Sequence, residues 1–198
     1  MARRRTLFGL AAGLVSPGKL VFLDESGART HMTRLYGRSR GGDRCVDYTS
    51  GGHWKAYTML AALRATGIIR HASLLGEGAM TGELFLAWVR QRLAPSLLPG
   101  DVVVMDNLNC HKVPGVEAAI EAAGASLWYL PPYSPDLNPI EKAWSKVKAQ
   151  LRRACAATAE QLHDAVGAAL DAVTPADCRA FIQSCGYRTR ERRSRKLL

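Results

Sequence analysis

Two short apolar runs that each end in an aspartate most constrain how this chain can fold. The first is Lys19-Leu-Val-Phe-Leu-Asp24 and the second is Asp101-Val-Val-Val-Met-Asp106. Apolar runs of this length, bounded by turn residues, are typical of buried strands. Ligand sites in open α/β sheets lie beyond the carboxyl ends of the strands. If the two strands are parallel neighbours, both aspartates are therefore predicted to reach one site.

The rest of the chain predicts an α/β fold, a mixed sheet flanked by helices with a helical C-terminal extension. Further strands are expected at residues 56–65, 68–75 and 126–130, the first two joined at Thr66-Gly67, and a helix stays open for the alanine-rich 56–65. Alternation of strand and helix implies parallel strands, whereas the opening strands are expected to be antiparallel. Residues 1–18 look like a loose basic lead-in, and residues 25–55 look turn-rich and basic with one or two short strands. Helices are expected at residues 81–93, 113–123, 138–153, 158–173 and 175–185.

Charge and cysteine content narrow the class of protein. The chain has 198 residues, and Lys and Arg outnumber Asp and Glu by 27 to 17, for a net charge of +10. This balance favours a polyanionic partner, nucleic acid first, although a soluble protein can also simply be basic. The five cysteines are odd in number and form no Cys-x-x-Cys pair, which argues against a disulfide framework and a zinc site and fits a reducing cytosol. No apolar run is long enough to span a membrane.

A third carboxylate, Glu141, opens a predicted helix and can join Asp24 and Asp106. Three such carboxylates can hold two divalent cations, Mg²⁺ or Mn²⁺, and two cations can cut a phosphodiester. Plainer readings remain open: strand-end aspartates form turns, and Asn138 with Glu141 has the form of a capping box. Asp136 is the rival third carboxylate and is interpreted as a turn residue. Glu25 is expected to point to the opposite face of the strand from its neighbour Asp24.

Three sequence blocks resemble the catalytic blocks of DDE transposases. Pro131-Pro-Tyr-Ser-Pro-Asp-Leu-Asn-Pro-Ile-Glu141, followed by Trp144, resembles the third block of the mariner-like superfamily, and within it a bacterial insertion-sequence branch. Val104-Met-Asp-Asn-Leu108 with His111-Lys112 resembles the second block, and Phe22-Leu-Asp-Glu-Ser26 the first. Thirty-four residues separate Asp106 from Glu141, the interval usual in that superfamily. The resemblance covers about residues 19–187.

The resemblance implies a ribonuclease H-like fold in which Asp24, Asp106 and Glu141 are catalytic and hold two Mg²⁺ or Mn²⁺ ions. It implies cleavage at transposon ends and strand transfer into target DNA by cut-and-paste, in a synaptic homodimer in the bacterial cytoplasm. Full-length members carry an N-terminal helix-turn-helix region, and only 18 residues precede the first strand here, so that portion is expected to be encoded elsewhere. The expected units are a lead-in (1–18), a catalytic domain (19–155), a helical extension (156–187) and a basic tail (188–198).

Several basic and polar residues are candidates for DNA contact. Near Asp106, His111 and Lys112 are close enough in sequence to reach the same phosphate, and His111 has the equal alternative of packing the turn. Trp54 can stack on bases, although core packing is the commoner role of a lone Trp. An inactive DNA-binding remnant and a ribonuclease H-like nuclease without strand transfer are the competing functions. The full set of candidates is Asn107, His111, Lys112, Arg34, Arg38, Arg40, Trp54, Arg188, Arg190, Arg192 and Arg193.

Overall fold

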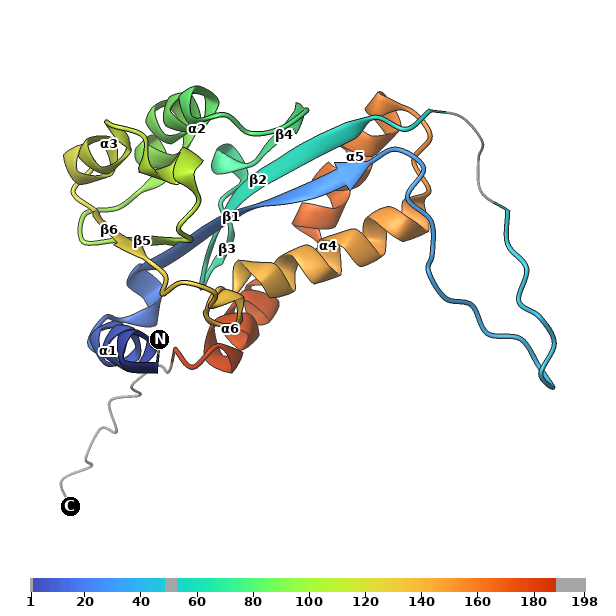
Figure 1. Cartoon of the computed structure of the whole chain (residues 1–198), viewed down its shortest axis with the longest axis horizontal. Helices are drawn as coiled ribbons and strands as arrows, with labels where there is room; N and C mark the ends of the chain where they lie inside the picture. Colours follow the sequence, from blue (N-terminus) through green and yellow to red (C-terminus); the bar gives the residue numbers. More distant parts are fainter. Residues whose placement is uncertain (1, 49–52, 188–198) are drawn as a thin grey trace, which may run out of the picture.

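A six-stranded mixed sheet forms the centre of the protein, with helices on both of its faces (Figure 1). The computed structural model describes residues 2–48 and 53–187. The strands run in the order β3-β2-β1-β5-β6, and β4 also pairs with β2. β1, β5 and β6 are parallel, whereas β2 is antiparallel to β1, β3 and β4. The strands are β1 (Leu20–Arg29), β2 (Ala56–Arg64), β3 (Gly67–Ile68), β4 (Leu74–Glu77), β5 (Val102–Met105) and β6 (Ser126–Tyr129).

Each face of the sheet has its own hydrophobic core, because the residues of the central strand alternate between the two faces. Leu20 and Phe22 of β1 join the core under α4, α5 and α6, whereas Val21 and Leu23 join the core under α2 and α3. Burial on both faces explains the continuous apolar run of β1. The helices are α1 (Ala2–Ala12), α2 (Gly82–Trp88), α3 (Val116–Ala122), α4 (Ile140–Ala154), α5 (Ala159–Asp171) and α6 (Pro175–Ser184).

The register of the two parallel central strands brings the two predicted aspartates together. Leu20 is opposite Val102 and Phe22 is opposite Val104. Asp24 comes two residues after Phe22, and Asp106 comes two residues after Val104, so the two aspartates occupy equivalent positions beyond this last pair. The predicted parallel pairing of the two apolar runs is confirmed, and so is the mixed α/β sheet.

The strand predictions need three corrections. β1 does not end at Asp24 but continues to Arg29, because it pairs with β2 along this whole length. The described residues 30–48 contain no strand, although one or two were expected in 25–55, and they project from the body as an extended segment (Figure 1). The expected strand at 68–75 is divided into β3 and β4, which a 3-10 turn separates and which both pair with β2. The alanine-rich run 56–65 is a strand, not a helix.

The helix predictions are closer, and the largest error is at the N-terminus. The expected loose lead-in contains α1, which packs Phe8 edge-on against Trp128 at 6.2 Å between ring centroids. α3 starts at Val116 instead of residue 113, because Gly115 before it takes a φ of +97°, outside helical geometry. α2 is shorter than expected and continues as a π-helical turn at Val89–Leu93. No helix within residues 2–48 and 53–187 has the length and apolar character needed to cross a membrane.

Candidate active site

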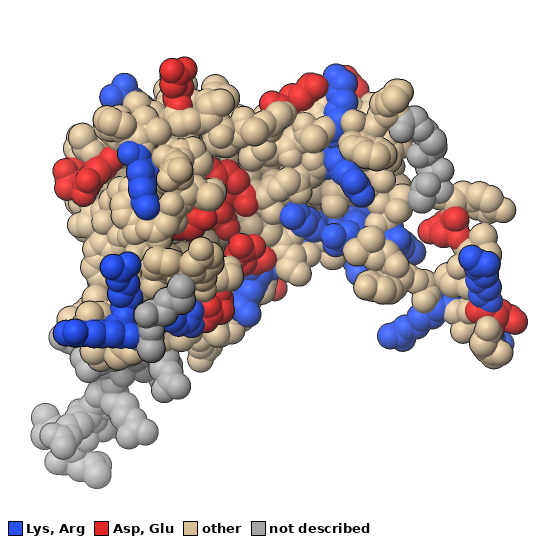
Figure 2. Space-filling view, viewed as in Figure 1, with Lys and Arg blue, Asp and Glu red and all other residues tan. Residues whose placement is uncertain are grey.

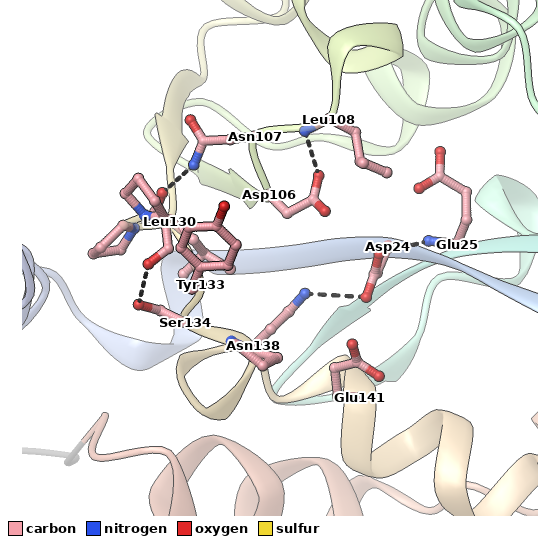
Figure 3. Close-up of a pocket in the computed structure, with 13 residues that line it drawn as sticks. Asp24, Glu25, Asp106, Asn107, Leu108, Leu130, Tyr133, Ser134, Asn138 and Glu141 are labelled. Atoms are coloured by element: carbon pink, nitrogen blue, oxygen red, sulfur yellow. Dashed lines mark hydrogen bonds between the residues drawn. The ribbon is translucent and has the colours of Figure 1, made fainter. Parts of the chain in front are cut away.

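An open cavity of about 570 Å³ lies where β5 ends, beside β1 and the start of α4 (Figure 3). Asp24 is on β1, Asp106 follows β5 directly, and Glu141 is in the first turn of α4. All three predicted carboxylates therefore line one cavity, although they come from distant parts of the sequence. The full lining consists of Asp24, Glu25, Asp106, Asn107, Leu108, Leu130, Pro131, Pro132, Tyr133, Ser134, Pro135, Asn138 and Glu141.

Asp24 is the most buried of the three carboxylates, with 8% of its surface exposed. The backbone N–H of Glu25 donates to its Oδ1 at 2.8 Å, and the Asn138 amide donates to its Oδ2 at 3.4 Å. Burial, followed by the nearby charge of Glu141, raises the pKa of Asp24 to about 8, and Asp106 adds to the rise. These neighbours act by like-charge repulsion, which disfavours a second ionised carboxylate in the same space.

Asp106 has the opposite electrostatic environment. Partial burial by itself would raise its pKa, but contact with His111 and the hydrogen bond from the Leu108 N–H outweigh that effect and lower the pKa. The Leu108 N–H donates to Asp106 Oδ1 at 2.9 Å, and His111 Nδ1 lies 2.7 Å from the same oxygen. At neutral pH Asp106 is therefore ionised, while Asp24 is mostly protonated in the absence of a cation.

Glu141 is an exposed residue at the start of α4, and its carboxylate is free of the capping role considered from the sequence. Pro139 occupies the N-cap position, and the described residues provide no side-chain cap there. Ile140 and Trp144 are fully buried and fix the helix against the sheet. Their burial leaves Glu141 at the edge of the packed face, directed into the cavity below Asp24 (Figure 3).

Asn138 is a site residue that we had interpreted from the sequence as a helix cap. Its side chain is buried and points at Asp24 instead (Figure 3). The amide oxygen Oδ1 of Asn138 has no hydrogen-bond partner among the described residues. A buried acceptor without a partner costs about 1–3 kcal/mol. Asn138 thus lines the cavity with an amide whose buried oxygen is unsatisfied within the described residues.

Side chains from the N-terminal helix α1 and from the segment after α6 both bind the loop before α4. Arg5 of α1 donates to Ser134 at 2.8 Å and to Asp136 Oδ1 at 2.9 Å. Tyr187 donates its hydroxyl to the carbonyl of Leu137 at 2.7 Å. Asp136 lies in a short 3-10 turn and is absent from the cavity lining. It serves in the turn, as the sequence had indicated.

Glu25, which also lines the cavity, forms a partly buried pair with His111. The carboxylate of Glu25 points away from Asp24 (Figure 3), as predicted, and its two oxygens lie 2.9 and 3.0 Å from His111 Nε2. The His111 side chain has no exposed surface. This leaves it no room to contact a phosphate, so the packing alternative replaces the predicted DNA contact. With the thiol of Cys110, the pair places possible metal-ligand atoms within 4.8 Å of one another.

The other DNA candidates are spread over the surface. Lys112 is exposed with its ammonium 5.5 Å from the Tyr129 ring centroid, and Asn107 donates its amide to the carbonyl of Leu130. Trp54 is 62% exposed, and Arg29 lies 5.4 Å from its ring centroid, so the expected core role is wrong. Figure 2 shows both basic and acidic side chains on the projecting segment, and further acidic ones near the middle of the same face. Exposed on that segment are Arg34, Arg38 and Arg40, whereas Arg188, Arg190, Arg192 and Arg193 lie outside the described residues.

Residues 19–163 match the DDE superfamily endonuclease family. This chain belongs to that family. The match covers well over half of the sequence and includes all three carboxylates of the cavity. The predicted enzyme class, a DDE-type endonuclease, is confirmed. No curated protein gives a significant sequence match.

Solved structures of Mos1, a mariner transposase, share the fold. The Mos1 strand transfer complex superposes with a TM-score of 0.68 at 14% identity, over 92% of this chain and 56% of that one. The Mos1 paired-end complex with Mn superposes with a TM-score of 0.68 at 15% identity, again over 92% of this chain and 56% of that one. The isolated Mos1 catalytic domain gives 0.62 at 14% identity, over 92% of this chain and 86% of that one. The predicted ribonuclease H-like fold is confirmed, and this chain spans 56% of the length of the Mos1 chain in the strand transfer complex.

Proposed function

We propose that this chain is the catalytic part of a DNA transposase of the mariner-like superfamily, in a bacterial insertion-sequence branch. In this proposal it cuts DNA at transposon ends and joins the ends to target DNA. The observation that carries the proposal is the convergence of Asp24, Asp106 and Glu141 on one open cavity. Asp24 is on a strand, Asp106 directly follows the neighbouring strand, and Glu141 is on a helix, so the fold brings together the carboxylates that a metal-dependent nuclease requires.

The donor set of the cavity suits divalent Mg²⁺ or Mn²⁺. Its ligand atoms are all hard oxygens, and such cations prefer carboxylate and amide oxygens. Burial and the nearby carboxylate of Glu141 raise the pKa of Asp24, and within the described part of the chain Asn138 Oδ1 has no hydrogen-bond partner. Mos1 paired-end complexes were solved with Mn and with Mg. We assign two ions to the site, and when bound they would activate a water and neutralise the leaving oxygen.

The residues of the chain have distinct parts in the proposed reaction. Asp24, Asp106 and Glu141 hold the cations, and Asn138 orients Asp24 through its amide. In the first step a water oxygen attacks the scissile phosphorus and the P–O3′ bond breaks, which leaves a 3′ hydroxyl and a 5′ phosphate. In the second step that 3′ hydroxyl attacks a target phosphodiester and displaces its 3′ oxygen. One P–O bond replaces another, so the joining step requires no external energy source.

DNA is the proposed substrate and partner. The net charge of +10 favours a polyanion, the projecting segment carries three exposed arginines, and Trp54 is also exposed. We propose that these residues and Lys112 contact the phosphate backbone, with Asn107 at the cavity edge. The four arginines of the predicted basic tail are proposed to add contacts of the same kind. The similar Mos1 structures include a strand transfer complex and a paired-end complex with a left transposon end.

We further propose that the chain works as a homodimer in a synaptic complex. The projecting segment of residues 30–48 exposes large apolar side chains that do not pack on the body of the protein. Such side chains suit a surface that a second chain covers. Recognition of specific ends would lie in a separate N-terminal helix-turn-helix portion, and the complex would act on DNA in the bacterial cytoplasm. The exposed apolar residues are Leu35, Tyr36, Val46 and Tyr48.

A plasmid assay tests the proposed function without knowledge of the cognate ends. Supercoiled plasmid is incubated with Mn²⁺, the protein and a labelled duplex with a free 3′ hydroxyl. Nicked plasmid reports hydrolysis, and label joined to plasmid reports strand transfer. The wild type should do both, and Asp106→Asn should be slower by at least about 100-fold. Asp164→Asn, on the exposed face of α5, is the matched control and should behave as wild type.

Each outcome of this assay selects one function. Nicking without joining would favour a ribonuclease H-like nuclease that lacks strand transfer. Binding of the duplex without either reaction would favour an inactive remnant. Equal activity of the wild type and Asp106→Asn would mean that the cavity is not the catalytic site.

A further inference from the structure

We infer that His111 is a positioning residue, which bridges Glu25 and Asp106 and thereby fixes the Asp106 carboxylate for cation binding. This inference rests on the proposed function and assigns a part to two residues outside the three carboxylates. His111 itself would touch neither the cation nor DNA. It would act only through Asp106.

The bridge is visible in the contacts of the imidazole ring. Nδ1 lies 2.7 Å from Asp106 Oδ1, and Nε2 lies 2.9 Å from one oxygen of Glu25. Each ring nitrogen therefore contacts a different carboxylate, and the ring bridges the two. The contact with Asp106 is a short ion pair that lies off the N–H axis.

Packing holds the ring in this orientation from three sides. The ring packs against Phe85 of α2 with centroids 4.4 Å apart and the ring planes tilted by 37°. The backbone N–H of His111 donates to the Leu108 carbonyl at 3.1 Å, and the Tyr129 hydroxyl donates to the His111 carbonyl at 3.2 Å. Its position is therefore set by α2, β6 and its own turn, and not only by the carboxylates.

Asp106 needs such support because it lies just beyond the end of β5. A residue beyond the end of a strand is not held by the inter-strand backbone hydrogen bonds that fix the strand residues before it. The side chain of Asp106 is also 38% exposed. Both the Leu108 N–H and His111 contact Oδ1 of Asp106, and these two contacts restrain the rotation of the carboxylate at the cavity wall. Outer residues that orient a metal ligand in this manner typically contribute about 10–100-fold to metal affinity.

The direction of the change in affinity separates positioning from simple charge. A charged ring near a cation site would repel the cation, and a neutral ring would not attract it. If His111 does not position Asp106, the variant His111→Gln should therefore bind Mn²⁺ at least as tightly as wild type. If His111 positions Asp106, the same variant binds Mn²⁺ more weakly.

Calorimetric titration of the full chain with Mn²⁺ alone tests the inference. His111→Gln should bind about 10–100-fold more weakly than wild type. Glu25→Gln should also weaken binding, and the double variant should lose less than the product of the two single losses, because Glu25 acts through His111. His163→Gln, an exposed histidine of α5, is the matched control and should bind as wild type.

A second readout separates positioning from loss of the fold. Thermal melting identifies any variant that does not fold, and Glu25→Gln, an isosteric change, tests the bridge if His111→Gln fails to fold. Excess Mn²⁺ should restore plasmid nicking by His111→Gln but not by Asp106→Asn. Unchanged or tighter Mn²⁺ binding by His111→Gln would overturn the inference and leave the proposed function in place. No Mn²⁺ binding by the folded wild type would instead overturn the proposed function, and the inference with it.

Discussion

Replacement of Asp24 by asparagine should stabilise the metal-free protein, because the native carboxylate is held in a place that disfavours its charge. The pKa of Asp24 is about 8 in the folded protein, against 3.8 for an unperturbed aspartate. At any pH between these two pKa values, the folded state binds more protons than the unfolded state. The free energy of unfolding therefore falls as pH rises through this window, by about 1.4 kcal/mol per pH unit. Asparagine cannot ionise, so the variant lacks this loss.

The expected difference can be worked from the two pKa values. At pH 7, about three units above the unfolded value, the variant should be more stable by about 4 kcal/mol. At pH 5 the difference should shrink to about 2 kcal/mol by the same linkage. For a chain of this length, 1 kcal/mol shifts the melting temperature by about 2–4 °C, so the rise at pH 7 should be on the order of 10 °C.

Thermal melting in EDTA, at both pH values, measures this difference. Asp164→Asn is the control, because the side chain of Asp164 is almost fully exposed. Addition of Mn²⁺ at 100 times its dissociation constant should stabilise the wild type by about 2.7 kcal/mol and Asp24→Asn much less. A variant no more stable than wild type, or a difference that does not grow with pH, would refute the reasoning.

Three further results are expected. Mn²⁺ affinity should rise about tenfold from pH 6 to pH 7 and level off above about pH 8, because the cation must displace the proton of Asp24; calorimetry at a series of pH values checks this, and a flat profile would contradict it. Replacement of Arg34, Arg38 and Arg40 by alanine should flatten the salt dependence of duplex binding by up to about 0.9 per lost phosphate contact, and an unchanged slope would remove the projecting segment from the DNA surface. Thr158→Ala should lower the free energy of unfolding measured in urea by about 1 kcal/mol, because Thr158 and Gln161 form a complete capping box at the start of α5. An unchanged free energy of unfolding would mean that the capping box does not stabilise the protein.

The sequence predicted the central strands and the carboxylates well, because both depend on local patterns. The apolar runs before Asp24 and Asp106 are each buried strands, and a parallel pairing puts their ends together without any further information. The start of α4 after a proline-rich stretch was equally clear. Helix caps with a side-chain signature, such as Thr158, were also predictable.

Other features depend on long-range contacts that no local pattern contains. β1 continues past Asp24 through polar residues only because β2 pairs with it there. α1 is anchored by Phe8 and Arg5 against residues more than a hundred positions away. A basic segment with such partners looks like a loose lead-in when its partners are unknown.

The contacts of the site residues that we missed share this cause. Asn138 has the residue type and position of a helix cap, and only the fold shows that its amide faces Asp24. His111 and Glu25 are far apart in sequence, and their pairing requires β1 and the turn after β5 to meet. The alternation of strand side chains did predict that Glu25 faces away from Asp24.

The most direct test of the central claim is anomalous X-ray diffraction from crystals soaked in Mn²⁺. Our account predicts two anomalous peaks in the cavity, bound by Asp24, Asp106 and Glu141. It also predicts that both peaks disappear in Asp106→Asn crystals. A cavity without a peak, or a peak only at the Glu25, Cys110 and His111 cluster, would contradict the proposal that these three carboxylates form a metal-dependent catalytic site.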